Sequence, residues 1–61
     1  MSMKIKLFDR VKLKDGREGD IMEIFGDQEA FEITLGDFGR WYDETIEYDQ
    51  IEKVINSSKK E

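Results

Sequence analysis

The chain has 61 residues, with ten basic and fifteen acidic side chains, no cysteine and no histidine. A chain this short forms one small domain, and without cysteine it has neither disulfides nor thiolate-bound metal to support its core. Histidine is the commonest general base and metal ligand, and the three serines lie near the ends of the chain, so we expect no enzymatic activity, metal or cofactor.

The first residues, MSMKIKLF, contain only a brief apolar stretch and no small-residue cleavage pattern, so they do not resemble a signal peptide. No later segment approaches the roughly 20 apolar residues that span a membrane. We therefore expect a soluble, cytoplasmic protein without a membrane partner. Its single domain is expected over residues 1–55, followed by a flexible charged tail over residues 56–61.

Several short runs alternate apolar and polar residues, which is the period of a strand with one buried face. Phe31, Ile33 and Leu35, for example, are separated by Glu32 and Thr34. The runs are separated by glycine-containing sequences that favour tight turns. The pattern predicts five strands, over residues 10–14, 18–25, 30–35, 40–47 and 53–55, with a short 3₁₀ turn over residues 48–51 before the last strand.

The stretch DGREGDIMEI, residues 15–24, contains two glycines with separate expected roles. Gly16 follows an aspartate, a pair that is favoured where a tight turn needs a positive φ. Gly19 lies inside the next predicted strand, where glycine usually marks a bulge, a bend or a close backbone approach. Because Ile21 and Ile24 are three residues apart, a bulge between them would place both on the inner face.

Five short strands are too few for two packed sheets, and a flat sheet of them would leave aggregation-prone edges. A strongly bent, partly closed barrel with one layer of side chains inside avoids both difficulties. The sequence therefore predicts an all-β fold, namely a five-stranded small barrel with a short 3₁₀ turn before the last strand.

The residues from Val11 to Ile24 resemble the KOW motif of SH3-like barrels. Val11 and Leu13 match its first strand, and Gly19 is followed by apolar residues two and five positions later. Residues 8–55 are also similar to small uncharacterised bacterial proteins of about this length. The resemblance implies that the all-β fold is a five-stranded SH3-like small barrel. It is nearly silent on function, because one small-barrel fold hosts many roles.

KOW proteins bind RNA or the transcription machinery, so the resemblance implies an RNA- or ribosome-associated module. Lys12, Lys14 and Arg17 would then provide the positive charge that meets phosphates. Residues 1–19 hold six basic and three acidic side chains, whereas residues 20–61 hold four basic and twelve acidic ones. Because the acidic majority repels a polyanion, nucleic acid is the weaker of the two partner predictions.

The aromatic residues divide into candidates for the core and for the surface. Phe25 and Phe31 lie in strand patterns and are expected in the core. Trp41 shares strand parity with Asp43 and Glu47, which places it on a polar outer face. A bulge just before Trp41 would instead bury it as the largest side chain of the core, and the sequence leaves both placements open.

An exposed Trp41 beside Phe38, ringed by acids, would suit a basic protein or peptide partner. The acids concerned are Glu32, Asp43 and Glu47, which could equally serve solubility and protect strand edges. The sequence therefore favours a non-enzymatic interaction module that binds a protein or peptide. A further alternative is a structural domain that forms a homodimer through a strand edge, at residues 11–13 or 53–55.

Overall fold

The computed structural model describes residues 4–37 and 39–57 of the chain. Five antiparallel strands form one sheet, a single 3₁₀ turn precedes the last strand, and the described residues contain no α-helix. The predicted all-β fold is thereby confirmed. The elements are β1 (Arg10–Leu13), β2 (Glu18–Phe25), β3 (Ala30–Asp37), β4 (Arg40–Glu47), η1 (Tyr48–Gln50) and β5 (Ile51–Asn56).

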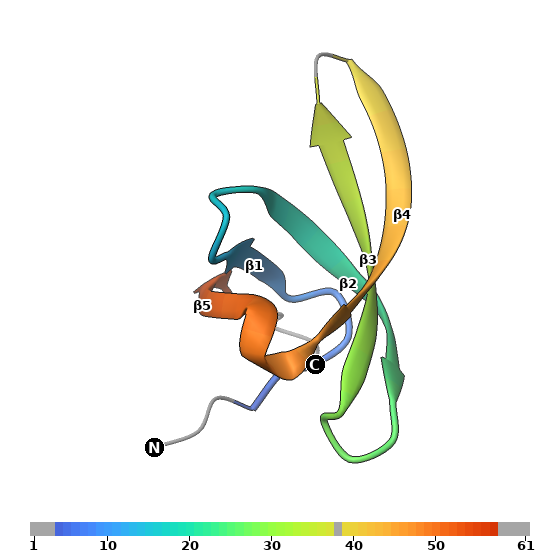
Figure 1. Cartoon of the computed structure of the whole chain (residues 1–61), viewed down its shortest axis with the longest axis vertical. Helices are drawn as coiled ribbons and strands as arrows, with labels where there is room; N and C mark the ends of the chain where they lie inside the picture. The colour runs from blue at the N-terminus through green and yellow to red at the C-terminus, as the bar shows by residue number, and fades with distance from the viewer. Residues whose placement is uncertain (1–3, 38, 58–61) are drawn as a thin grey trace.

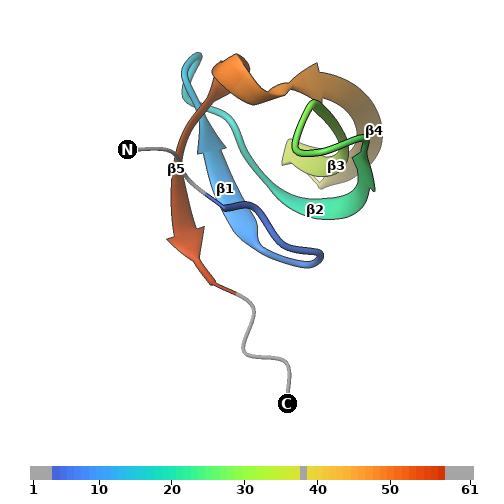
Figure 2. The ribbon, with the colours of Figure 1, turned by 90° about the horizontal axis from the view of Figure 1, so that it is seen from below.

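The strands follow the order β4-β3-β2-β1-β5 across the sheet (Figure 1). The sheet coils strongly, so that β2 and β4 curve around the same interior when the molecule is viewed from below (Figure 2). The two end strands, β4 and β5, do not pair with each other, so the barrel stays partly open. This is the SH3-like arrangement that the sequence predicts.

The position of β1 corrects one expected dimerisation edge. β1 pairs with β2 on one side and with β5 on the other, so residues 11–13 lie inside the sheet and their backbone is already paired. Among the described strands, the edges belong to β4 and β5. Of the two edges suggested for a homodimer, only the one at residues 53–55 remains available.

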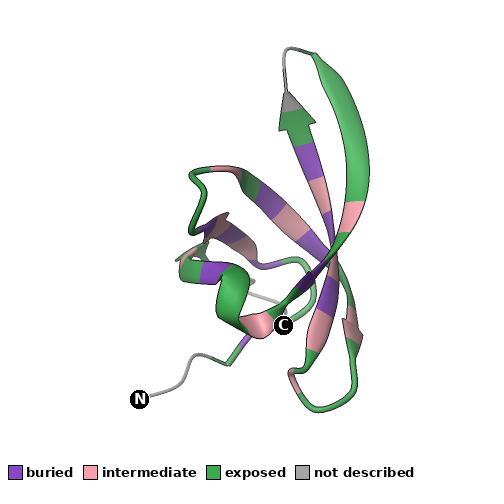
Figure 3. Cartoon of the chain, in the orientation of Figure 1, coloured by how far each residue is buried: buried purple, intermediate pink, exposed green. Residues whose placement is uncertain are grey.

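Among the described residues, nine buried apolar side chains form the core, and all five strands contribute to it. Buried and less buried residues alternate along β3, as expected for a strand with one face inward (Figure 3). Apolar burial of this kind is the main favourable term in folding. The core side chains are Ile5, Val11, Leu13, Ile21, Phe31, Ile33, Leu35, Ile46 and Ile51.

The second strand contains the irregularity that sets its inner face. Gly19 is buried and pairs with Leu35, and the register with β3 shifts between Ile21 and Glu23. Ile24, after the shift, lies opposite Phe31 and packs against the core. The extra residue at this bulge thus allows two isoleucines three positions apart to face the same interior.

Phe25 was expected in the core, and this prediction is wrong. Its side chain is 42 % exposed, whereas Phe31 is fully buried as predicted. The reason is the bulge: once Ile24 takes the inner position, the next residue along the strand faces outward. Phe25 therefore lies on the outer side of β2, near its end.

The N-terminal segment contributes to the core although it has no regular strand. Ile5 is buried, and its N–H donates to Gln28 Oε1 at 2.7 Å while Gln28 Nε2 donates to the Ile5 carbonyl at 3.0 Å. Asp9 is buried as well, and its carboxylate accepts a hydrogen bond from the N–H of Lys6 at 2.9 Å. Through the two hydrogen bonds of Gln28, the β2–β3 turn holds the start of the chain against the barrel.

The last strand is longer than predicted at both ends. β5 begins at Ile51, which pairs with Leu13, and it includes Asn56, which pairs with Arg10. The tail expected from residue 56 therefore starts inside the sheet, and residues 58–61 lie outside the described part of the chain.

Candidate interaction surface

The outer side of the β3–β4 hairpin brings together most of the residues predicted to bind a partner. Opposed residues of antiparallel strands share a face, and the pairs here are Gly36–Trp41, Thr34–Asp43, Glu32–Thr45 and Ala30–Glu47. We call the surface formed by Glu32, Trp41, Asp43 and Glu47 the outer acidic face. Phe38, the fifth residue of the predicted site, lies outside the described residues.

Trp41 lies on the surface, not in the core. Its side chain is 71 % exposed, so the alternative of a buried tryptophan is wrong. Its ring packs across Gly36 on the neighbouring strand, because a Cβ atom placed on Gly36 would lie 2.6 Å from Trp41 Cζ3. An aromatic ring that covers a cross-strand glycine stabilises the pair of strands and holds the indole in one place. The Trp41 indole is therefore exposed to solvent on one side and packed against Gly36 on the other.

A neighbouring strand holds the Asp43 carboxylate of the outer acidic face in place. The hydroxyl of Thr34 donates to Asp43 Oδ1 at 2.8 Å. Glu32 lies directly opposite Glu23 on β2, an acid that the sequence reasoning did not assign to the site. Like charges in direct cross-strand positions are mutually destabilising, so a positively charged partner placed between them would relieve an existing repulsion.

The three residues predicted for nucleic-acid binding do not share one surface. Lys12 lies between two buried residues of β1 and faces outward, with Glu18 opposite on β2 and Lys53 opposite on β5. Lys14 is exposed in the β1–β2 turn. Arg17 instead hydrogen-bonds to Asp15 and to Glu44, and Glu44 lies opposite the buried Ile33 on the inner side of the sheet.

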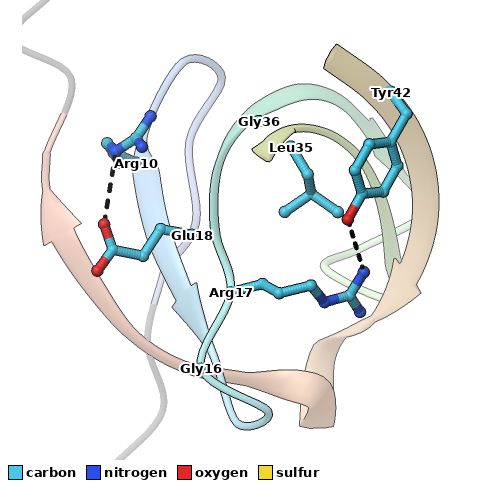
Figure 4. A pocket seen from close by; sticks show the side chains of 7 residues that line it. All are labelled: Arg10, Gly16, Arg17, Glu18, Leu35, Gly36 and Tyr42. Atoms are coloured by element: carbon cyan, nitrogen blue, oxygen red, sulfur yellow. Dashed lines mark hydrogen bonds and ion pairs between the residues drawn. The ribbon is translucent and has the colours of Figure 1, made fainter. Parts of the chain in front are cut away.

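Arg17 joins the β1–β2 turn to β4 through hydrogen bonds to two carboxylates, and we call Arg17 with Asp15 and Glu44 the latch. Its Nη1 donates to Glu44 Oε1 at 2.8 Å, and its Nε donates to Asp15 Oδ2 at 2.8 Å. A weaker contact of 3.4 Å joins Nη1 to the hydroxyl of Tyr42. These bonds connect the β1–β2 turn with β4, 27 residues further along the chain. Arg17, Tyr42 and Gly36 also line an open pocket of about 390 Å³, and the contact between Arg17 and the Tyr42 hydroxyl is drawn in Figure 4. The Arg17 guanidinium, which a phosphate would need, is therefore already paired with two carboxylates.

The latch also makes the acid stability of the protein depend on Arg17. Hydrogen bonds from Arg17 lower the pKa of Glu44 and the pKa of Asp15 below their ordinary values. A carboxylate with a lowered folded-state pKa stabilises the fold above its unfolded pKa, and this contribution is lost as the pH falls through the folded pKa. The effect is modest, because these side chains are well exposed to solvent.

We therefore expect Arg17→Ala to lower the urea midpoint at pH 7, and the difference from the parent protein to shrink below about pH 4. Urea titrations between pH 7 and pH 2 measure this difference. Lys14→Ala, which removes an exposed positive charge from the same turn, is the matched control. A difference that stays constant over the whole pH range would contradict the latch.

The described residues contain no helix long and apolar enough to cross a membrane. They also contain no group of three or more acidic side chains placed to hold a metal ion. Comparison of the chain with protein-family models, curated proteins and solved structures finds no match.

Proposed function

We propose that the protein is a non-enzymatic interaction module that binds a basic protein or peptide segment on the outer acidic face. The observation that carries this proposal is the placement of Trp41, which is 71 % exposed and steadied by Gly36. Tryptophan is strongly enriched among the residues that dominate binding energy at protein interfaces. Because it is held on a regular strand, it loses little conformational freedom when a partner binds.

The acidic side chains on the same face as Trp41 support a positively charged partner. Glu32, Asp43 and Glu47 share its face, and Glu23 adds a fourth carboxylate on the next strand. Complementary charge speeds association and excludes partners of the wrong sign. A segment rich in lysine or arginine therefore fits this surface better than RNA does. The RNA-associated module implied by the KOW resemblance is the alternative that the following experiment separates from this proposal.

The expected result for Trp41→Ala is a loss of binding with little loss of stability. We expect a lysine- and arginine-rich 12-residue peptide to bind the parent protein at low salt and to bind the variant at least about tenfold more weakly. The free energy of unfolding should fall by about 1 kcal/mol or less, the usual worth of a cross-strand pair. Fluorescence anisotropy of the labelled peptide and thermal denaturation measure the two quantities.

Two controls test the position of the ring and the sign of the charge. Gly36→Ala keeps the indole but displaces it, because the new Cβ would overlap its six-membered ring, so this variant should also bind weakly. Asp43→Asn should weaken binding more than Asp49→Asn, since Asp49 lies in η1 and not on β3 or β4. Equal peptide binding by the parent protein and Trp41→Ala would refute the proposal, and so would preferential binding of a single-stranded RNA oligonucleotide.

A further inference from the structure

The open edge of β4 has a hydrogen-bonding pattern that can be deduced from its neighbours. In an antiparallel pair, alternate residues turn both their N–H and C=O groups toward the partner strand, and the residues between them turn these groups away. The register between β3 and β4 runs without a shift from Ala30–Glu47 to Asp37–Arg40. One known hydrogen bond therefore fixes the direction of every backbone group along β4.

Two hydrogen bonds at the end of β4 supply that reference point. The N–H of Tyr48 donates to the carbonyl of Glu29 at 3.3 Å, which places Tyr48 among the residues that face β3. The N–H of Glu47 donates instead to the side-chain oxygen of Gln50 at 2.8 Å, so Glu47 faces away from β3. Both observations give the same alternation, and Gln50 covers the end of the edge.

Counting back from Glu47 by twos assigns the free edge to three residues. The N–H and C=O groups of Trp41, Asp43 and Thr45 point away from β3, toward the side on which no described strand pairs with β4. Their side chains lie on the outer face, since each is opposite an outward-facing residue of β3. The exposed indole, the Asp43 carboxylate and the available backbone groups thus belong to the same short stretch of strand.

We propose that the basic segment binds as an additional antiparallel strand along residues 41–45 of β4. This inference rests on the proposed function and specifies how the partner is held. Strand addition gives affinity through main-chain hydrogen bonds and specificity through alternate side chains. The partner residues opposite Trp41, Asp43 and Thr45 share their outer face, so positive side chains at every second position would lie beside the carboxylates of Asp43 and Glu47.

The acids of β4 also indicate why the occupant is not a second copy of the same strand. Pairing β4 with itself would bring Asp43 and Glu47 of the two copies close together, and like charges across a strand pair repel. Acidic side chains thus block self-pairing at this edge while leaving it open to a strand of opposite charge.

The experiment uses one decapeptide sequence that alternates lysine with valine or threonine, in three backbone forms. The first is unmodified, the second carries N-methyl groups on the lysines, and the third carries them on the residues between. In the proposed antiparallel pairing, the lysines are the residues whose N–H groups meet β4. We expect methylation of the lysines to weaken binding at least tenfold and methylation of the others to leave it nearly unchanged.

Amide hydrogen exchange locates the added strand on the protein. Bound peptide should slow exchange at Trp41, Asp43 and Thr45 and leave β5 unaffected. If both methylated forms bind as well as the parent peptide, or protection appears along β5, strand addition at β4 is overturned while the proposed function stands. Weakening only by methylation between the lysines would overturn the antiparallel pairing. Failure of every basic form to bind, with an alternating glutamate peptide as the negative control, would overturn the proposed function itself.

Discussion

Gly19→Ala is expected to leave the protein largely unfolded at room temperature. A Cβ at this position would lie 2.5 Å from the backbone oxygen of Thr34 and 2.8 Å from side-chain carbons of Ile33 and Leu35. The backbone oxygen is fixed in β3, so the clash cannot be relieved by turning a flexible side chain. Overpacking of this kind costs about 3 kcal/mol, and more when the backbone cannot move. This is most of the free energy of unfolding of a domain of this size.

Gly16→Ala is the matched comparison for this prediction. Gly16 has a φ of +100°, but a Cβ there would meet no other atom within 4 Å. Its replacement therefore costs only the backbone strain of a positive φ, about 1 to 2 kcal/mol, and the variant should still fold. Far-ultraviolet circular dichroism and urea denaturation of the two variants measure the contrast. Equal stability of the two would contradict the close packing of β2 against β3 at Gly19.

The parts of the fold that could be read from the sequence are those with local signals. The bounds of β2 and β4 match the predicted ranges 18–25 and 40–47, because turn-forming residues flank both strands. β3 continues two residues beyond the predicted end at residue 35, since pairing with β4 persists toward the hairpin tip. β5 begins two residues early because Ile51 pairs with Leu13, a contact between distant segments.

Contacts between distant segments also explain what was missed. Ile5 lies in the brief alternating run MKIKL and is buried without belonging to a regular strand, so the sequence pattern alone does not mark it as part of the core. It exchanges two hydrogen bonds with Gln28, 23 residues away. The partners of Arg17 on β4 are likewise invisible in the sequence, where the residue looks like a free cation in a basic strand. The latch becomes apparent only when the bent sheet brings the β1–β2 turn near Glu44.

The placement of Trp41 shows that strand parity alone cannot assign a residue to the inner or outer face when a bulge can occur in the strand. Parity put the residue on the outer face, yet one bulge near the start of β4 would have reversed it. The register between β3 and β4 contains no such shift, and this decides the question. The KOW-like resemblance and the binding role stay predictions. Both concern what the barrel is used for, and many roles share this kind of fold.

Phe31→Ala is expected to abolish stable folding, and it has the largest effect of any core truncation in the described part of the chain. Phe31 is the largest fully buried side chain and lies near the start of β3. Its ring centroid is 6.4 Å from that of Tyr48. Truncation of a buried phenylalanine costs about 3 to 5 kcal/mol, because apolar contacts are lost and a cavity remains. Near-ultraviolet circular dichroism and urea denaturation at 25 °C measure the loss.

Phe25→Ala removes the same atoms from the end of the neighbouring strand. Its comparison with Phe31→Ala therefore shows how much of the loss of stability is due to burial of the phenylalanine. Phe25 lies opposite Ala30 on the outer side of β2 and is 42 % exposed, so its truncation should cost about 1 kcal/mol or less. Phe31→Leu keeps most of the buried volume and should remain folded with an intermediate midpoint. If Phe25→Ala proved as damaging as Phe31→Ala, the inward turn of Ile24 after the bulge would be wrong. The inner face of β2 would then have to be assigned again from Ile21 onward.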